Sequence, residues 1–108
     1  MDNHQADHQA AVVEVGGKIA MQSVSILIDP RSSHSYIHPK IVESCSLKKS
    51  KHGKSWLVQL VTGTKRKVNR YTHAMCARCG YVASIRMLIA TQNGALHTPL
   101  LQKTLSRS

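Results

Sequence analysis

An apolar run that ends in one carboxylate is the feature that most constrains how this chain folds. Residues 26–28 read Ile-Leu-Ile, and Asp29 and Pro30 follow directly, ahead of a Ser-rich stretch. An unbroken apolar run bounded by turn-forming residues is typical of a strand buried on both faces. The pattern therefore predicts a buried strand that carries Asp29 to the start of a loop. On the residues alone an ordinary Asp-Pro turn is the simpler interpretation, and a catalytic acid is the alternative.

Two β-hairpins are expected on either side of this loop. In the first, a strand over residues 10–15 and a strand over residues 18–28 are joined by Gly16-Gly17. Glycine accepts the positive φ angles of a two-residue turn, so this pair predicts the reversal of the chain. The second hairpin joins a strand over residues 55–61 to a shorter return strand through a turn centred on Gly63.

A short helix is expected between the two hairpins, over residues 39–47. Pro39 suits the first turn of a helix because its φ angle is already helical. Ile37, Ile41 and Cys45 recur at intervals of four residues, which places them on one helical face.

The chain divides into three parts. Residues 1–9 are polar and predict a flexible N-terminus, and residues 10–68 predict one mainly β module with a solvated basic loop at 48–54. Residues 69–108 show no sustained period and predict a divergent basic tail of low order. Within this tail, residues 81–90 are compatible with either a strand or a helix.

The basic residues are concentrated in the second half of the chain. The net charge is +10, and residues 44–108 contain twelve Lys and Arg residues but no Asp or Glu. Residues 1–43 contain five acidic and three basic residues. A basic half indicates either nucleic-acid binding or a segment that was never shaped as a folded domain.

The span from Val12 to about Val68 resembles the retropepsin-like aspartic proteases of plant gypsy-type long-terminal-repeat retrotransposons. The family pattern is a Gly-containing hairpin, an apolar strand, Asp-Ser/Thr-Gly and a Ser/Thr-His-Ser/Asn-Tyr/Phe-Ile stretch. It appears here as VEVGGKIAMQSVSILIDPRSSHSYI, and the following KIVESCSLKKSKHGKSWLVQLVTGTKRKV is similar to the same group. The resemblance implies a retropepsin-like half-barrel within a gag-pol polyprotein.

The resemblance also implies a mechanism. Each subunit of a homodimer supplies one Asp, the two close carboxylates share a proton, and the pair activates a water molecule against the peptide bond. Asp29 is the residue that this places at the catalytic position. The hairpin around Gly63 becomes the flap over a polypeptide substrate, and no cofactor is implied.

Two departures from the family pattern predict loss of this activity. Pro30 and Arg31 stand where the family has a hydroxyl residue and Gly, so the turn lacks one hydrogen-bonding side chain and gains a cation. An Arg beside the carboxylates favours their ionised form. After Val68 the family's apolar-apolar-Gly segment and its terminal strands are not recognisable, which suggests a truncated domain with a tail from a shifted reading frame.

Two further classes of function remain open beside an inactive peptidase. One is a basic module that binds nucleic acid without sequence preference through Lys and Arg contacts to phosphates. Trp56 and Tyr71 are the aromatic residues available for base stacking near that cluster. The other is a translated remnant without a selected function. The basic residues of the nucleic-acid hypothesis are Lys48, Lys49, Lys51, Lys54, Lys65, Arg66 and Lys67.

A metal site is not expected. Cys76 and Cys79 have the spacing of half a zinc site, with His73 as a third ligand and Cys45 or His97 as a distant fourth. A structural zinc needs four ligands, so ordinary reduced cysteines are the preferred interpretation.

The expected location is the cytoplasm. The polar N-terminus shows no signal peptide, and no apolar run approaches the roughly 20 residues of a membrane span. The small number of cysteines is consistent with a reducing, intracellular environment.

Overall fold

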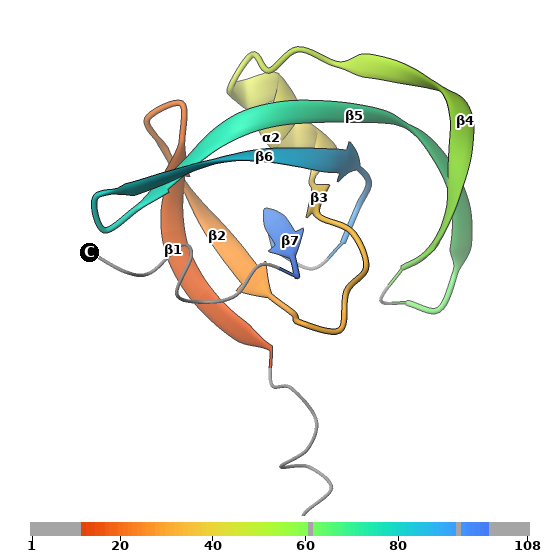
Figure 1. Cartoon of the computed structure of the whole chain (residues 1–108), viewed down its shortest axis with the longest axis horizontal. Coiled ribbons are helices and arrows are strands. Elements are labelled where there is room, and N and C mark those ends of the chain that lie inside the picture. Colours follow the sequence, from red (N-terminus) through yellow and green to blue (C-terminus); the bar gives the residue numbers. More distant parts are fainter. Residues whose placement is uncertain (1–11, 61, 93, 100–108) are drawn as a thin grey trace, which may run out of the picture.

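The computed structural model describes residues 12–60, 62–92 and 94–99 (Figure 1). These residues form a mainly β fold with one short helix, as expected. No helix in them is long and apolar enough to cross a membrane. The elements are β1 (Val13–Ile19), β2 (Gln22–Ile28), β3 (Tyr36–Ile37), α2 (Pro39–Ser44), β4 (Ser50–Gln59), β5 (Lys65–Arg78), β6 (Tyr81–Ile89) and β7 (Leu96–Thr98).

The sheet closes on itself through a contact between β1 and β5. Its strand order is β1-β2-β7-β3-β6-β5-β4, and β1 pairs additionally with β5 at Lys18↔Ala77 and Ile19↔Cys76. β7 is parallel to β2 and antiparallel to β3. β4 pairs with the long, strongly curved β5 and lies on the outside of this ring (Figure 1).

Two apolar clusters fill the structure, and the strands supply most of their members. Successive residues of β1 and β2 alternate between more buried and more exposed positions, and the β-branched residues occupy the inward positions, as expected of a strand with one face against a core. The main cluster contains Val15, Ile19, Val24, Ile26, Ile28, Ile37, Val42, Ala74, Cys76, Ile85, Met87 and Leu96. The second contains Tyr36, Val58, Val68, Leu88 and Ala90, with Trp56, Leu60 and Tyr71 packed against it.

The first hairpin turn lies at Ala20-Met21, so its placement at Gly16-Gly17 was wrong. Ala20 and Met21 have φ angles of 51° and 69°, the positive values that a two-residue hairpin turn requires at both centres. Gly17 lies within β1, and a Cβ atom there would be 2.5 Å from Ile26 Cδ1 and 3.0 Å from the Ala77 carbonyl oxygen. The glycine is therefore required for the close approach of β1 to β2 and β5, and not for a turn.

The helix begins at Pro39 as predicted but ends at Ser44 and not at residue 47, and the loop predicted over residues 48–54 ends before β4 begins at Ser50. His38 precedes Pro39 as the N-cap, and its Nδ1 accepts a hydrogen bond from the Lys40 N–H at 3.1 Å. Residues 50–54, expected in a basic loop, belong to β4. Ser50 and Lys51 pair with Tyr71 and Arg70 of β5, and a register shift follows before the pairing resumes at Trp56.

The prediction of low order after Val68 is wrong for residues 69–92 and 94–99. β5 continues through Arg78, β6 is a strand and not a helix, and β7 is inserted between β2 and β3. Thr72, Ala74 and Cys76 alternate inward along β5, and Met87 of β6 is fully buried. These small or polar inward residues gave no strong hydrophobic period. Residues 100–108 and the predicted flexible residues 1–9 lie outside the described residues.

Candidate functional site

Asp29 lies at the point where β2 leaves the sheet. Ile28 pairs with Thr98 of β7, and the Asp29 N–H donates to the Thr98 carbonyl oxygen at 2.7 Å. The Ser32 N–H donates to the Asp29 carbonyl oxygen at 2.9 Å, which closes a four-residue turn. Pro30 occupies the second position of that turn, where its fixed φ angle is favourable and its missing N–H costs nothing.

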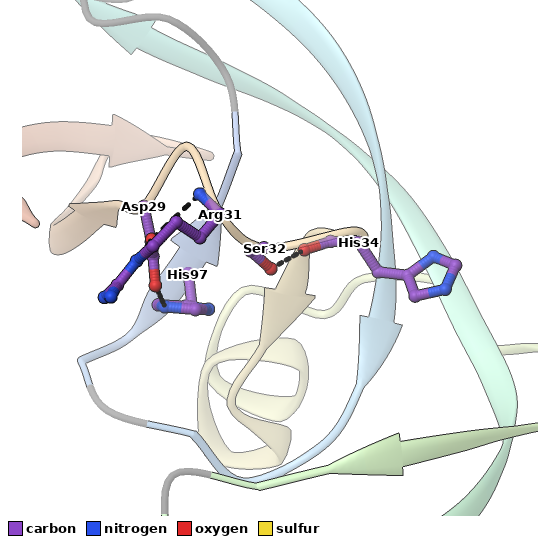
Figure 2. A network of polar contacts seen from close by, with 5 residues as sticks. All are labelled: Asp29, Arg31, Ser32, His34 and His97. Carbon is purple, nitrogen blue, oxygen red and sulfur yellow. Dashed lines mark hydrogen bonds and ion pairs between the residues drawn. The ribbon is translucent and has the colours of Figure 1, made fainter. Parts of the chain in front are cut away.

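The Asp29 carboxylate is bound to two basic side chains of the same chain (Figure 2). The backbone N–H of Arg31 donates to Oδ1 at 3.0 Å, and the Arg31 Nε donates to the same oxygen at 3.2 Å. The Nε2 atom of His97 lies 3.5 Å from Oδ2. Only 14% of the Asp29 side chain is exposed, against 57% for Arg31.

These contacts determine the protonation state of Asp29. Burial by itself raises the pKa of the carboxyl group, because it disfavours the charged form. The two hydrogen bonds from Arg31 and the electrostatic interactions with Arg31 and His97 act in the opposite direction, and together they bring the pKa below the ordinary value of 3.8. Asp29 is therefore an ionised, charge-compensated group at neutral pH.

His97 is the site residue that sequence reasoning missed as a partner of Asp29. It was considered only as a distant zinc ligand, whereas in the structure it pairs with Leu27 of β2 and Tyr36 of β3. The His97 residue is 8% exposed, and its Nδ1 has no hydrogen-bond partner among the described residues. No local pattern signals this contact, because it depends on the insertion of β7 beside β2.

Two hydroxyl contacts hold the loop between Asp29 and β3. Ser35 Oγ and Thr98 Oγ1 lie 2.8 Å apart and share a hydrogen bond, which ties the end of the loop to β7. Ser32 Oγ donates to the His34 carbonyl oxygen at 2.7 Å (Figure 2). One contact thus joins the loop to β7, and the other lies within the loop.

A cavity of about 310 Å³ opens beside this loop. One wall is the Asp29 loop with Tyr36 and His97, and the facing wall is β4. Asp29 is the single carboxylate among the lining residues. The lining residues are Asp29, Arg31, Ser32, Ser33, His34, Tyr36, Leu57, Val58, Gln59, Gln92 and His97.

Gly63 lies in the turn of the β4–β5 hairpin, as the sequence predicted. Its φ angle is 91°, which favours glycine, and its N–H donates to the Leu60 carbonyl oxygen at 2.8 Å. Gly63 is not among the residues that line the cavity, whereas residues 57–59 of the same hairpin are. The hairpin therefore contacts the cavity through β4 and not through its turn.

The seven basic residues of the nucleic-acid hypothesis are all exposed. They extend along one hairpin: Lys48 and Lys49 precede β4, Lys51 and Lys54 lie on β4, and Lys65, Arg66 and Lys67 begin β5. Among the described residues no group of three or more His, Cys, Asp or Glu side chains is placed to hold a metal ion.

The arrangement around Asp29 offers an ionised carboxylate paired with a cation, and one chain supplies one such acid. It cannot by itself hold the proton that a pair of close carboxylates shares.

Comparison with known proteins found no matching family model, no matching curated protein and no matching solved structure.

Proposed function

We propose that this chain is a retropepsin-like aspartic peptidase domain of a retroelement polyprotein that has lost its catalytic activity. In an active domain of this kind, two copies of the chain would form a homodimer and cleave a polypeptide with paired Asp29 carboxylates. No cofactor takes part in that chemistry. The sequence resemblance over residues 12–68 supports the assignment to this family. The contacts of the Asp29 carboxylate support the loss of catalytic activity.

The position of Asp29 supports the peptidase origin. The carboxylate follows a buried apolar strand, its backbone is fixed to β7, and it lines a cavity whose other wall is the β4–β5 hairpin. A peptidase needs an acid at the base of a cleft and a cover above it, and the position of Asp29 beside β4 supports the proposal.

The contact between Arg31 and Asp29 is the main observation in support of the proposed loss of activity. An aspartic dyad works because one carboxyl keeps its proton while the other is ionised. Arg31 donates twice to the Asp29 carboxylate and stabilises its charge, as His97 does from the other side. Each carboxylate in a dimer would therefore be compensated by its own chain, and neither would need to retain the shared proton.

Peptide cleavage at mildly acidic pH tests both parts of the proposal. We expect no turnover by the natural chain that a transition-state-analogue inhibitor of aspartic proteases can block. The double variant Pro30→Ser/Arg31→Gly should regain inhibitor-sensitive cleavage at concentrations where ultracentrifugation shows a dimer, and adding Asp29→Asn should abolish it.

Two outcomes would count against the proposal. Inhibitor-sensitive turnover by the natural chain would show that Arg31 does not prevent catalysis by Asp29. A dimeric double variant without any cleavage would remove the reason to regard Asp29 as a former catalytic residue.

A further inference from the structure

The distal half of the β4–β5 hairpin borders a groove lined by cations. This groove has a volume of about 620 Å³ and lies between the hairpin, the end of β6 and the start of α2. Arg66, Lys67 and Arg70 are among its lining residues, and none of the lining residues is an Asp or Glu. No acidic residue follows Glu43 in the sequence, and the ion pairs of the described residues join no carboxylate to a cation of this hairpin.

Two partly exposed rings, those of Trp56 and Tyr71, pack against the apolar cluster that contains the groove-lining Val68. The Trp56 ring lies 4.5 Å from the His52 ring and 6.4 Å from the Tyr71 ring, measured between centroids. The exposed Arg86 guanidinium lies 5.2 Å from the centroid of Trp56 and 4.8 Å from that of Tyr71. This is a planar cation held over two aromatic faces, an arrangement on which a further planar group can stack.

The register of the hairpin places the rings and the cations together. Trp56 pairs with Val68, and residues directly paired in an antiparallel ladder share a face. Val68 lines the groove between Arg66 and Arg70, and it belongs to the apolar cluster against which Trp56 and Tyr71 pack. Arg66 and Arg70 lie two positions from Val68 on either side and line the same groove, and β4 has a register shift between Lys51 and Trp56 at this point.

We propose that this surface binds single-stranded nucleic acid, with Arg66 and Arg70 on the phosphates and bases stacked at Trp56, Tyr71 and Arg86. Cations that follow a backbone, combined with rings that stack on unpaired bases, are the recognition chemistry of single strands. Bases in a duplex are not available for such stacking. The chain also lacks, in its described part, a long helix for a major groove, since α2 has six residues. The proposal does not depend on whether Asp29 was catalytic.

The binding experiment uses the full 108-residue chain and fluorescein-labelled oligo(dT) and oligo(U) twelve nucleotides long, each followed by anisotropy. Trp56 is the single Trp of the chain, so its own fluorescence reports on this site. We expect both oligonucleotides to bind and to quench Trp56 at saturation. The ratio of the two affinities then distinguishes RNA from DNA as the preferred strand.

Two pairs of charge-neutralising substitutions separate a local site from net charge. The Arg66→Gln/Arg70→Gln variant loses two groove cations, whereas Lys18→Gln/Arg78→Gln loses two cations at the opposite end of β5, where Lys18 pairs with Ala77. If each groove cation contacts one phosphate, the slope of log affinity against log salt falls by about 1.4 in magnitude for the first pair. For the second pair we expect no change in slope.

The stacking contribution is tested separately, with far-UV circular dichroism as the check on folding. Trp56→Ala should weaken binding roughly 5- to 150-fold, the range for loss of one base–aromatic stack. Because Trp56 packs against an apolar cluster, the exposed Arg86→Gln provides a second variant, for which we expect at least several-fold weaker binding.

Four results would overturn the proposal. The first two are an equal change in salt slope for the two double substitutions and unchanged Trp56 fluorescence at saturation. The other two are an affinity for a duplex, or for a poly-glutamate peptide, equal to the affinity for the single strand. The last would identify an acidic polypeptide as the ligand. Unchanged affinity in a folded Arg86→Gln variant would remove the stacking part.

Discussion

A methyl group added at Gly17 should open the contact that closes the sheet. The new Cβ atom would lie 2.5 Å from Ile26 Cδ1 and 3.0 Å from the Ala77 carbonyl oxygen. Ile26 is fully buried, and the second neighbour is backbone of β5, so neither yields without disturbing the pairing of Lys18 with Ala77. Overpacking of this kind costs about 1–3 kcal/mol of the free energy of unfolding.

Gly16 provides a matched control one residue away on the same strand. A Cβ atom there has no neighbour within 4 Å. Replacing a strand-interior glycine by Ala reduces the entropy of the unfolded chain, so Gly16→Ala should be neutral or stabilise by up to about 1 kcal/mol. Urea unfolding followed by circular dichroism measures both variants.

A third substitution tests whether the δ-methyl group of Ile26 is what a Cβ atom at position 17 would clash with. Ile26→Val removes the δ-methyl group and alone should cost about 0.5–1.5 kcal/mol. In the double variant Gly17→Ala/Ile26→Val the cost should be smaller than the sum of the two single changes, because the new methyl group takes the vacated space. Strict additivity, or a Gly17→Ala protein as stable as Gly16→Ala, would refute the close-approach explanation of Gly17.

Three further predictions concern the core, the cysteines and the pH dependence of stability. Met87→Ala should lower the free energy of unfolding by about 2–5 kcal/mol in urea titrations, because Met87 is fully buried. Cys79 is exposed, whereas Cys76 is buried and burial raises the pKa of its thiol, so mass spectrometry should find Cys79 alkylated first in the native protein. The pKa of Asp29 is lowered by folding, so its interactions stabilise the protein above pH 3.8 and are lost as the pH falls through the folded-state value. The difference in unfolding free energy between the natural protein and Asp29→Asn should therefore shrink in that acid range, and a difference that stays constant would contradict this.

The sequence located the elements whose signals are local. The apolar run before Asp29, the helix start at Pro39 and the turn at Gly63 each depend on residues within a few positions of one another, and each lies where it was expected. The same reasoning misplaced the first turn, because two adjacent glycines are a strong turn signal and the packing requirement of Gly17 arises from β2 and β5. Ala20-Met21 gave no signal, since neither residue favours positive φ.

The second half of the sheet could not be predicted from period alone. Thr72, Ala74 and Cys76 point inward along β5, but a hydroxyl and two small side chains do not produce a clear alternation of hydrophobicity. β7 is three residues long and is held by strands on both sides. The contact of His97 with Asp29 depends on the position of β7. Only part of the candidate site could therefore be predicted from the sequence.

The central claim is that Asp29 is an ionised group compensated by Arg31 of its own chain. Carboxyl carbon shifts from NMR, followed from pH 7 to pH 2 with isotope-labelled Asp, measure this most directly. We expect the Asp29 carboxyl to titrate in one step with a pKa below 3.8, and Arg31→Gly to raise that pKa. A pKa above 3.8 in the natural chain, or a value that Arg31→Gly leaves unchanged, would contradict the account.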